Sequence, residues 1–195
     1  KRPASGRCGG KRRSKLKWVV KSKTEISSYV PMLNAAGCIN CRTDSMPNTP
    51  MLVAKGITAI APGTAATEQD LTLAEEIFDS CGQAVRVEEN LIDAVTAVSG
   101  SGPAYFFYLV EAMEQAAVNL GLSASQARDF VSATFEGSAE LLTRSGQSAE
   151  ALRRKVTSPG GTTEAAVGVL EGGKFKGLIN RAIRAAADRS KELSE

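Results

Sequence analysis

The second half of this chain is an almost unbroken succession of helical segments. From Asn90 onward, apolar residues recur at helical spacing, and short glycine or serine breaks separate the segments. Pro103 suits the first turn of a helix and Gly121 the position after its end, while Ser123 and Gln126 have the spacing of a capping box. The pattern predicts an all-α domain of six helices, over residues 90–98, 103–120, 123–145, 148–156, 163–170 and 175–193.

The stretch before Asn90 combines patterns typical of strands with one typical of a helix. Two runs, residues 51–60 and 84–87, have the composition of strands, and Thr67 with Asp70 predicts the capped start of a helix between them. We therefore expect a small α/β unit with two or three strands and one helix. The predicted organisation is a mainly α protein, with this small α/β unit over residues 46–88 and a helical domain over residues 89–195.

Residues 1–45 differ from the rest in charge. The first 23 residues hold ten basic side chains and no acidic one, whereas the remainder of the chain holds 14 basic and 21 acidic side chains. A disordered, solvated segment is the prediction, and an arm that binds nucleic acid is the less favoured alternative because few aromatic residues accompany the charges. No apolar run is long enough for a membrane span and no secretory signal is evident, so a cytoplasmic protein is expected.

Histidine is absent from the sequence. This excludes Ser-His-Asp and Cys-His catalytic sites and histidine-ligated zinc. Cys38 and Cys41 form a C-x-x-C pair without a second pair, which leaves a zinc site and a redox pair as alternatives to ordinary reduced thiols. No metal site is predicted.

Three short motifs could carry chemistry. Residues 158–163, Ser-Pro-Gly-Gly-Thr-Thr, precede a predicted helix, and such a start favours an anion, although an ordinary turn with a threonine cap has the same pattern. Residues 99–105, Ser-Gly-Ser-Gly-Pro-Ala-Tyr, predict a tight junction between helices that either packs closely or admits a ligand. Residues 46–50, Met-Pro-Asn-Thr-Pro, predict a rigid loop in which Asn48 offers a donor and an acceptor.

Glu88 and Glu89 begin the helical part, where negative carboxylates are stabilised by the positive end of the helix dipole.

Taken together and in this order, the motifs resemble those of the pyrroline-5-carboxylate reductases. The resemblance covers about residues 46–195 and is carried by residues 46–50, 91–105, 155–164 and 169–171. It implies that residues 46–88 are a truncated remnant of a Rossmann dinucleotide-binding domain. It also implies that the helical domain interlocks with a second subunit to form a homodimer or a larger homo-oligomer. It also implies hydride transfer from NADPH or NADH to a cyclic imine, giving L-proline.

The resemblance assigns roles to particular residues. The backbone at Gly161, Thr162 and Thr163 would hold the substrate carboxylate, and the Thr163 hydroxyl would face the ring nitrogen as the catalytic group. Glu89 matches a position close to the substrate. Asn48 and Lys155 would lie on the cofactor side. Such a site needs to position two partners and hold an anion, which a chain without histidine can do.

One part of the family pattern is missing. No G-x-G-x-x-G follows a strand, and only 45 residues precede Met46, too few for a nucleotide-binding sheet of several strands. Beside the resemblance, residues 1–45 are therefore interpreted as aberrant sequence, foreign, frameshifted or rearranged, joined to the C-terminal part of a reductase. We therefore expect that this chain alone binds NADPH weakly and turns over little substrate. A helical dimerisation module without catalytic activity, derived from the same family, is the alternative function.

Overall fold

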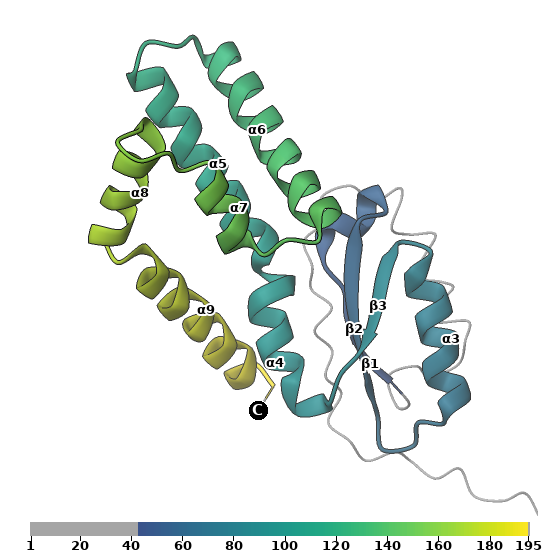
Figure 1. Ribbon diagram of the computed structural model, residues 1–195. Helices are drawn as coiled ribbons and strands as arrows, with labels where there is room; N and C mark the ends of the chain where they lie inside the picture. The colour runs from purple at the N-terminus through teal and green to yellow at the C-terminus, as the bar shows by residue number, and fades with distance from the viewer. Residues whose placement is uncertain (1–42, 195) are drawn as a thin grey trace, which may run out of the picture.

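The computed structural model describes residues 43–194. Figure 1 shows a small sheet with one helix at one side of the molecule and a set of longer helices at the other. We refer to residues 43–87 as the sheet unit and to residues 88–194 as the helical region. The predictions made for the basic segment and for the Cys38–Cys41 pair lie outside the described residues.

The sheet unit contains three strands in the order β1–β2–β3. Strand β2 (Gly56–Pro62) lies in the middle, antiparallel to β1 (Thr43–Met46) and parallel to β3 (Gly82–Arg86). The parallel pair needs a crossover, and helix α3 (Glu68–Asp79) provides it. Two strand runs and the helix between them were predicted. Strand β1 was not, and it begins three residues before the boundary expected at Met46.

A compact apolar cluster holds α3 against the sheet. Ile60 of β2 is fully buried, and Leu71, Ala74 and Phe78 present one face of α3 to it. The helix begins as the sequence predicted, because Thr67 and Asp70 form a reciprocal capping box. These features give the sheet unit a core of its own, although it is small.

Ion pairs of Arg86 connect the end of β3 to the exposed side of α3. Its guanidinium donates to Glu75 at 2.6 Å and to Glu68 at 2.6 Å. The hydrogen bond from Arg86 lowers the pKa of the Glu75 carboxyl below its ordinary value, and both carboxylates raise the pKa of Arg86. Helix α3 is therefore held to the sheet in two ways, by the buried apolar cluster around Ile60 and by the exposed ion pairs of Arg86.

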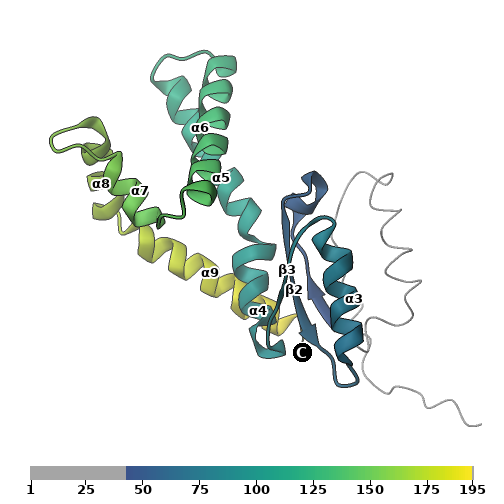
Figure 2. The ribbon, with the colours of Figure 1, turned by 45° about the vertical axis from the view of Figure 1, so that its right-hand side comes forward.

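The helical region follows the predicted order. Its five longer elements are α5 (Gly102–Asn119), α6 (Ala124–Ser145), α7 (Ala149–Lys155), α8 (Thr162–Gly172) and α9 (Phe175–Glu192). Ser123 and Gln126 form the second capping box, as predicted. Figures 1 and 2 show α5 and α6 running side by side away from the sheet, and α9 returning to the start of the region. There Ser190 donates to the carboxylate of Asp93 at 2.7 Å.

The first predicted helix, residues 90–98, is three short turns of different kinds. A 3₁₀ turn (Glu89–Leu91) leads into α4 (Ile92–Val95), which continues as a π-helical turn, η4 (Thr96–Gly100). The Ser101 N–H donates to the Thr96 carbonyl at 2.8 Å, the wider spacing that defines a π-turn. Hydrophobic periodicity cannot distinguish these turns, because each spans only three to five residues, too few to show a period.

The helical region exposes much of its apolar surface. Only a few of its residues are buried, and they are small: Ala97, Gly100, Gly102, Ala127 and Val131. Large apolar side chains on α5, such as Phe107 and Tyr108, are 65% and 74% exposed. None of the helices between residues 43 and 194 has the length and hydropathy to cross a bilayer.

Candidate functional site

The loop before α8 has a defined shape. The Gly161 N–H donates to the Ser158 carbonyl at 3.0 Å, and the Gly160 N–H donates to the Glu164 carboxylate at 2.7 Å. Gly160 has φ of +70°, a left-handed conformation that glycine adopts without strain. The loop is therefore held by its own turn and by the carboxylate of Glu164 in the first turn of the helix.

The start of α8 leaves donors available. The N–H groups of Thr162 and Thr163 find no acceptor among the described residues, and neither threonine hydroxyl is hydrogen-bonded there. Both N–H groups belong to the first turn of the helix, where the positive end of the dipole favours an anion. Of the three backbone positions expected to hold a carboxylate, Gly161 already uses its N–H in the turn, so Thr162 and Thr163 offer the free ones.

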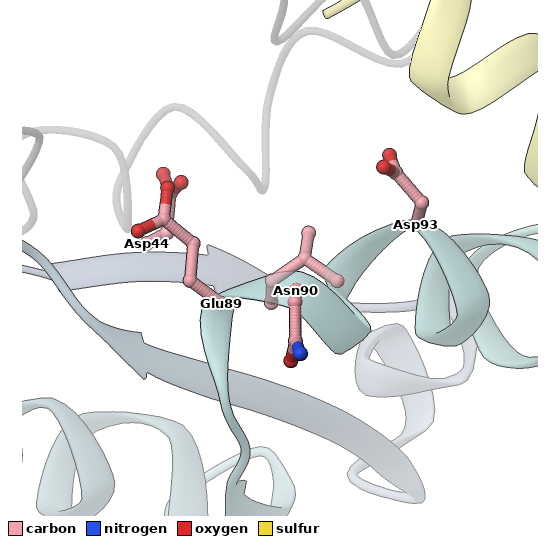
Figure 3. Close-up of a pocket in the computed structure, with 5 residues that line it drawn as sticks. Asp44, Glu89, Asn90 and Asp93 are labelled. Carbon is pink, nitrogen blue, oxygen red and sulfur yellow. The ribbon is translucent and has the colours of Figure 1, made fainter.

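Glu89 lies at a different place, beside the edge of the sheet. It lines an open hollow of about 450 Å³ together with Asp44, Asn90, Ile92 and Asp93. Figure 3 shows the carboxylates of Asp44 and Glu89 close together, with Asp93 set apart. The surroundings are acidic, so this hollow suits a cationic group and repels a carboxylate. Within residues 43–194, no group of acidic or cysteine side chains is arranged to hold a metal ion.

Asn48 has its side-chain amide fixed at both ends. The Oδ1 atom accepts from the Ile57 N–H at 3.0 Å, and Nδ2 donates to Ser99 Oγ at 3.2 Å. An amide can donate two hydrogens and accept two hydrogen bonds, so Asn48 keeps one N–H and one acceptor position for a ligand. The loop was predicted to be extended and rigid; the structure has Thr49–Val53 in a 3₁₀ turn with Pro50 near its start, and its rigidity stays a prediction.

The predicted site residues do not all meet within one chain. Figures 1 and 2 show α8 at the opposite side of the molecule from the sheet, so Thr162 and Thr163 are remote from Glu89 and Asn48. Lys155 is exposed at the last residue of α7, also in the part of the helical region away from the sheet. The roles given to these residues stay predictions.

The structure adds neighbours that sequence reasoning missed. Asp44 and Asp93 share the hollow with Glu89, and Ser99 is the partner of Asn48. Ser99 belongs to a motif that the sequence singled out, but nothing in that motif indicated which residue it would meet. Asp44 carried no signal, since its place depends on the pairing of β1.

Comparison with known proteins decides the family. A family model described as pyrroline-5-carboxylate reductase dimerisation matches residues 89–193. The chain belongs to the pyrroline-5-carboxylate reductase family. The match spans the whole helical region, including Glu89 and the loop before α8, and it confirms the resemblance seen in the sequence motifs.

Individual reductases agree with this assignment over a longer stretch. The pyrroline-5-carboxylate reductase of Corynebacterium melassecola is 43% identical over 150 residues, and that of Arabidopsis thaliana is 41% identical over 150 residues. Each alignment covers 77% of this chain but only 56% and 54% of those proteins. The chain therefore spans just over half the length of these curated relatives.

Solved reductase structures share the fold. The Plasmodium falciparum pyrroline carboxylate reductase, solved with NADP bound, superimposes with a TM-score of 0.74 at 34% identity, covering 78% of this chain and 63% of that one. The Coxiella burnetii pyrroline-5-carboxylate reductase gives 0.75 at 39% identity, covering 85% and 62%. The predicted fold, a small α/β part followed by a helical domain, is confirmed.

The described residues fit only part of a nicotinamide cofactor. The donor and acceptor left on Asn48 complement a carboxamide such as that of nicotinamide. The turn from β2 into α3 holds a single glycine, so no G-x-G-x-x-G fingerprint for the phosphates lies at a strand-to-helix turn of residues 43–194. Residues 43–194 therefore offer no such loop for the phosphates of a dinucleotide.

Proposed function

We propose that this chain carries the substrate side of a pyrroline-5-carboxylate reductase, which converts the cyclic imine pyrroline-5-carboxylate to L-proline. The observation that carries the proposal is the family match over residues 89–193, which includes the loop whose threonine donors are free. The cofactor would be NADPH or NADH, which supplies the hydride when bound. The cytoplasm is the proposed location.

The substrate carboxylate would bind at the start of α8. The N–H groups of Thr162 and Thr163 would donate to its oxygens, and the helix dipole would add a favourable field. The Thr163 hydroxyl would then reach the ring nitrogen, and we propose it as the catalytic group that orients the imine.

Glu89 would bind the positively charged part of the substrate. A protonated imine is a cation, and the acidic hollow around Glu89 suits a cation. The start of α8 and the hollow around Glu89 would thus orient a substrate that carries its carboxylate on the ring carbon next to the cationic imine nitrogen. Asn48 and Lys155 would complete the cofactor side, Asn48 through its remaining N–H and acceptor position.

A second copy of the chain would bring the separated residues together. Thr163 and Glu89 lie on opposite sides of one chain, and the apolar faces of the long helices are exposed. A homodimer or larger homo-oligomer in which α8 of one copy approaches the sheet unit of the other would cover apolar surface and assemble the site. This is the partner that we propose.

The test is the oxidation of NADPH by the purified chain in the presence of pyrroline-5-carboxylate, together with L-proline binding measured by calorimetry. We expect Thr163→Ala to weaken proline binding by about tenfold, the effect of one lost charge-assisted hydrogen bond. Thr162→Ala is the matched control, because it keeps the N–H and removes the hydroxyl with no proposed role. Equal proline affinity in both variants and the wild type would refute the proposed role of Thr163.

A module that dimerises without catalysing the reaction is the second candidate. It is favoured by the absence of a phosphate fingerprint from the described residues. Binding of proline without NADPH oxidation, and co-purification with a full-length reductase, would support this candidate. Turnover by the chain alone would exclude it.

A further inference from the structure

The sheet unit and the helical region are linked by one connection of the chain and by few polar contacts. The connection is the two-residue segment 87–88, between β3 and the 3₁₀ turn Glu89–Leu91. Among the described residues, only one side-chain hydrogen bond or ion pair crosses between the two parts. It joins Asn48 to Ser99, residues that are 51 positions apart in the sequence.

This hydrogen bond is well placed to transmit orientation. The Asn48 amide cannot rotate freely, because its Oδ1 accepts from the Ile57 N–H at the start of β2. The Nδ2 atom must then face Ser99, and the hydroxyl of Ser99 accepts. Both groups are half-buried, so the hydrogen bond is partly protected from water.

Ser99 is itself held in an unusual backbone turn. It lies in the π-turn of residues 96–100, and the Tyr105 hydroxyl donates to the Ala97 carbonyl of the same turn at 3.0 Å. The next residue, Gly100, is buried so close to β1 that a Cβ there would lie 3.4 Å from Met46 Sδ. The turn therefore contacts the sheet unit at two adjacent residues, one polar and one apolar. π-Turns occur often at functional positions.

We propose that Ser99 is a positioning residue that sets the orientation of the sheet unit on the helical region, acting through Asn48. Without the Ser99 hydroxyl, the segment 87–88 becomes a hinge, and the sheet unit reorients more freely. The proposal goes beyond the proposed reaction and does not depend on which ligand the chain binds. Loss of substrate binding would leave it intact, and loss of the orientation effect would leave the proposed reaction intact.

The experiment compares the two parts by residual dipolar couplings of backbone amides in the full chain. We expect the wild type to fit one alignment tensor for α3 and α9 together. In Ser99→Ala, the couplings of the sheet unit should fall relative to those of the helical region, while both parts stay folded. Ser99→Thr keeps the hydroxyl and should restore a common tensor. Ser101→Ala is the matched control, because its hydroxyl makes no hydrogen bond within the described residues.

A second measurement tests whether Ser99 acts through Asn48. Chemical unfolding of Ser99→Ala, Asn48→Ala and the double variant forms a double-mutant cycle. We expect the double variant to unfold at the same denaturant concentration as Asn48→Ala alone. Additive losses would overturn the proposal, since they would mean that the two residues act independently. The proposal would also be overturned if the couplings of both parts of Ser99→Ala fitted one alignment tensor without any decrease. The hydrogen bond would then add stability without setting the orientation of the sheet unit.

Discussion

The two parts of the molecule bury their apolar residues in different ways. The sheet unit packs Ile60, Leu71, Ala74 and Phe78 into a cluster of its own, whereas the helical region buries little beyond small residues within one chain. Long helices rich in apolar residues are stable when those residues leave water. The sheet unit therefore contains a core of its own, and the exposed apolar side chains of the helical region are the observation that supports the proposed homo-oligomer.

The largest expected effect lies in the core of the sheet unit. Phe78→Ala removes a ring that is 4% exposed, and we expect it to lower the free energy of unfolding by about 3–5 kcal/mol. Leu73→Ala, on the same helix but 46% exposed, should change it by less than about 1 kcal/mol. Chemical unfolding followed by circular dichroism measures both. Similar losses in the two variants would contradict the assignment of the core to the buried face of α3.

The next effect concerns the apolar surface of the helical region. Phe107→Glu places a charge on the exposed face of α5, where we expect it to weaken self-association by about thirtyfold, the size of an interface hot spot. Sedimentation across a concentration series measures the shift. Leu73→Glu is the control and should leave association unchanged, because Leu73 is 46% exposed on α3, which lies on the side of the sheet away from the helical region (Figure 1). If the control dissociates the assembly and Phe107→Glu does not, the comparison of the two parts is reversed.

The two capping boxes offer a matched pair with smaller effects. Thr67→Ala at the start of α3 and Ser123→Ala at the start of α6 each remove one cap, and each should cost about 1 kcal/mol locally. If the parts unfold separately, Thr67→Ala should shift only the transition of the sheet unit. Hydrogen exchange resolved by residue distinguishes this from one cooperative transition, in which both variants would affect every amide.

The smallest effect is a pH dependence of the sheet unit. Arg86 lowers the pKa of Glu75 in the folded state, so the pair stabilises the fold above the ordinary pKa near 4.5. This stabilisation is lost as the pH falls through the lowered pKa, because the unfolded chain binds the proton first. We expect Arg86→Met to flatten the fall of the melting temperature of α3 and its sheet below pH 4.5.

Arg144→Met is the control for the ion pair. It removes an exposed pair within α6 of the helical region, between Arg144 and Glu140. The acid response of the sheet unit should be unaffected by this change. If both variants flatten the pH dependence equally, the net charge of the protein, and not the ion pairs of Arg86, governs its stability in acid.

The sequence by itself determined the local structure of this protein. The bounds of α3 and of the longer helices to within a few residues, the two capping boxes and the glycine that follows α5 could be predicted, because they depend on residues three or four positions apart. The helix predicted over residues 90–98 was wrong, because the chain forms three short turns of different kinds there. The motifs at residues 46–50, 99–105 and 158–163 also identified the family, and the absence of histidine excluded whole classes of catalytic site.

Only the tertiary structure decided which distant residues meet. The pairing of β1 with β2 brings Asp44 near Glu89, and the π-turn places Ser99 against Asn48. These contacts depend on strand pairing and on an extra residue in one helical turn. Neither leaves a periodic signal in the sequence, because the partners are selected by packing and not by spacing along the chain.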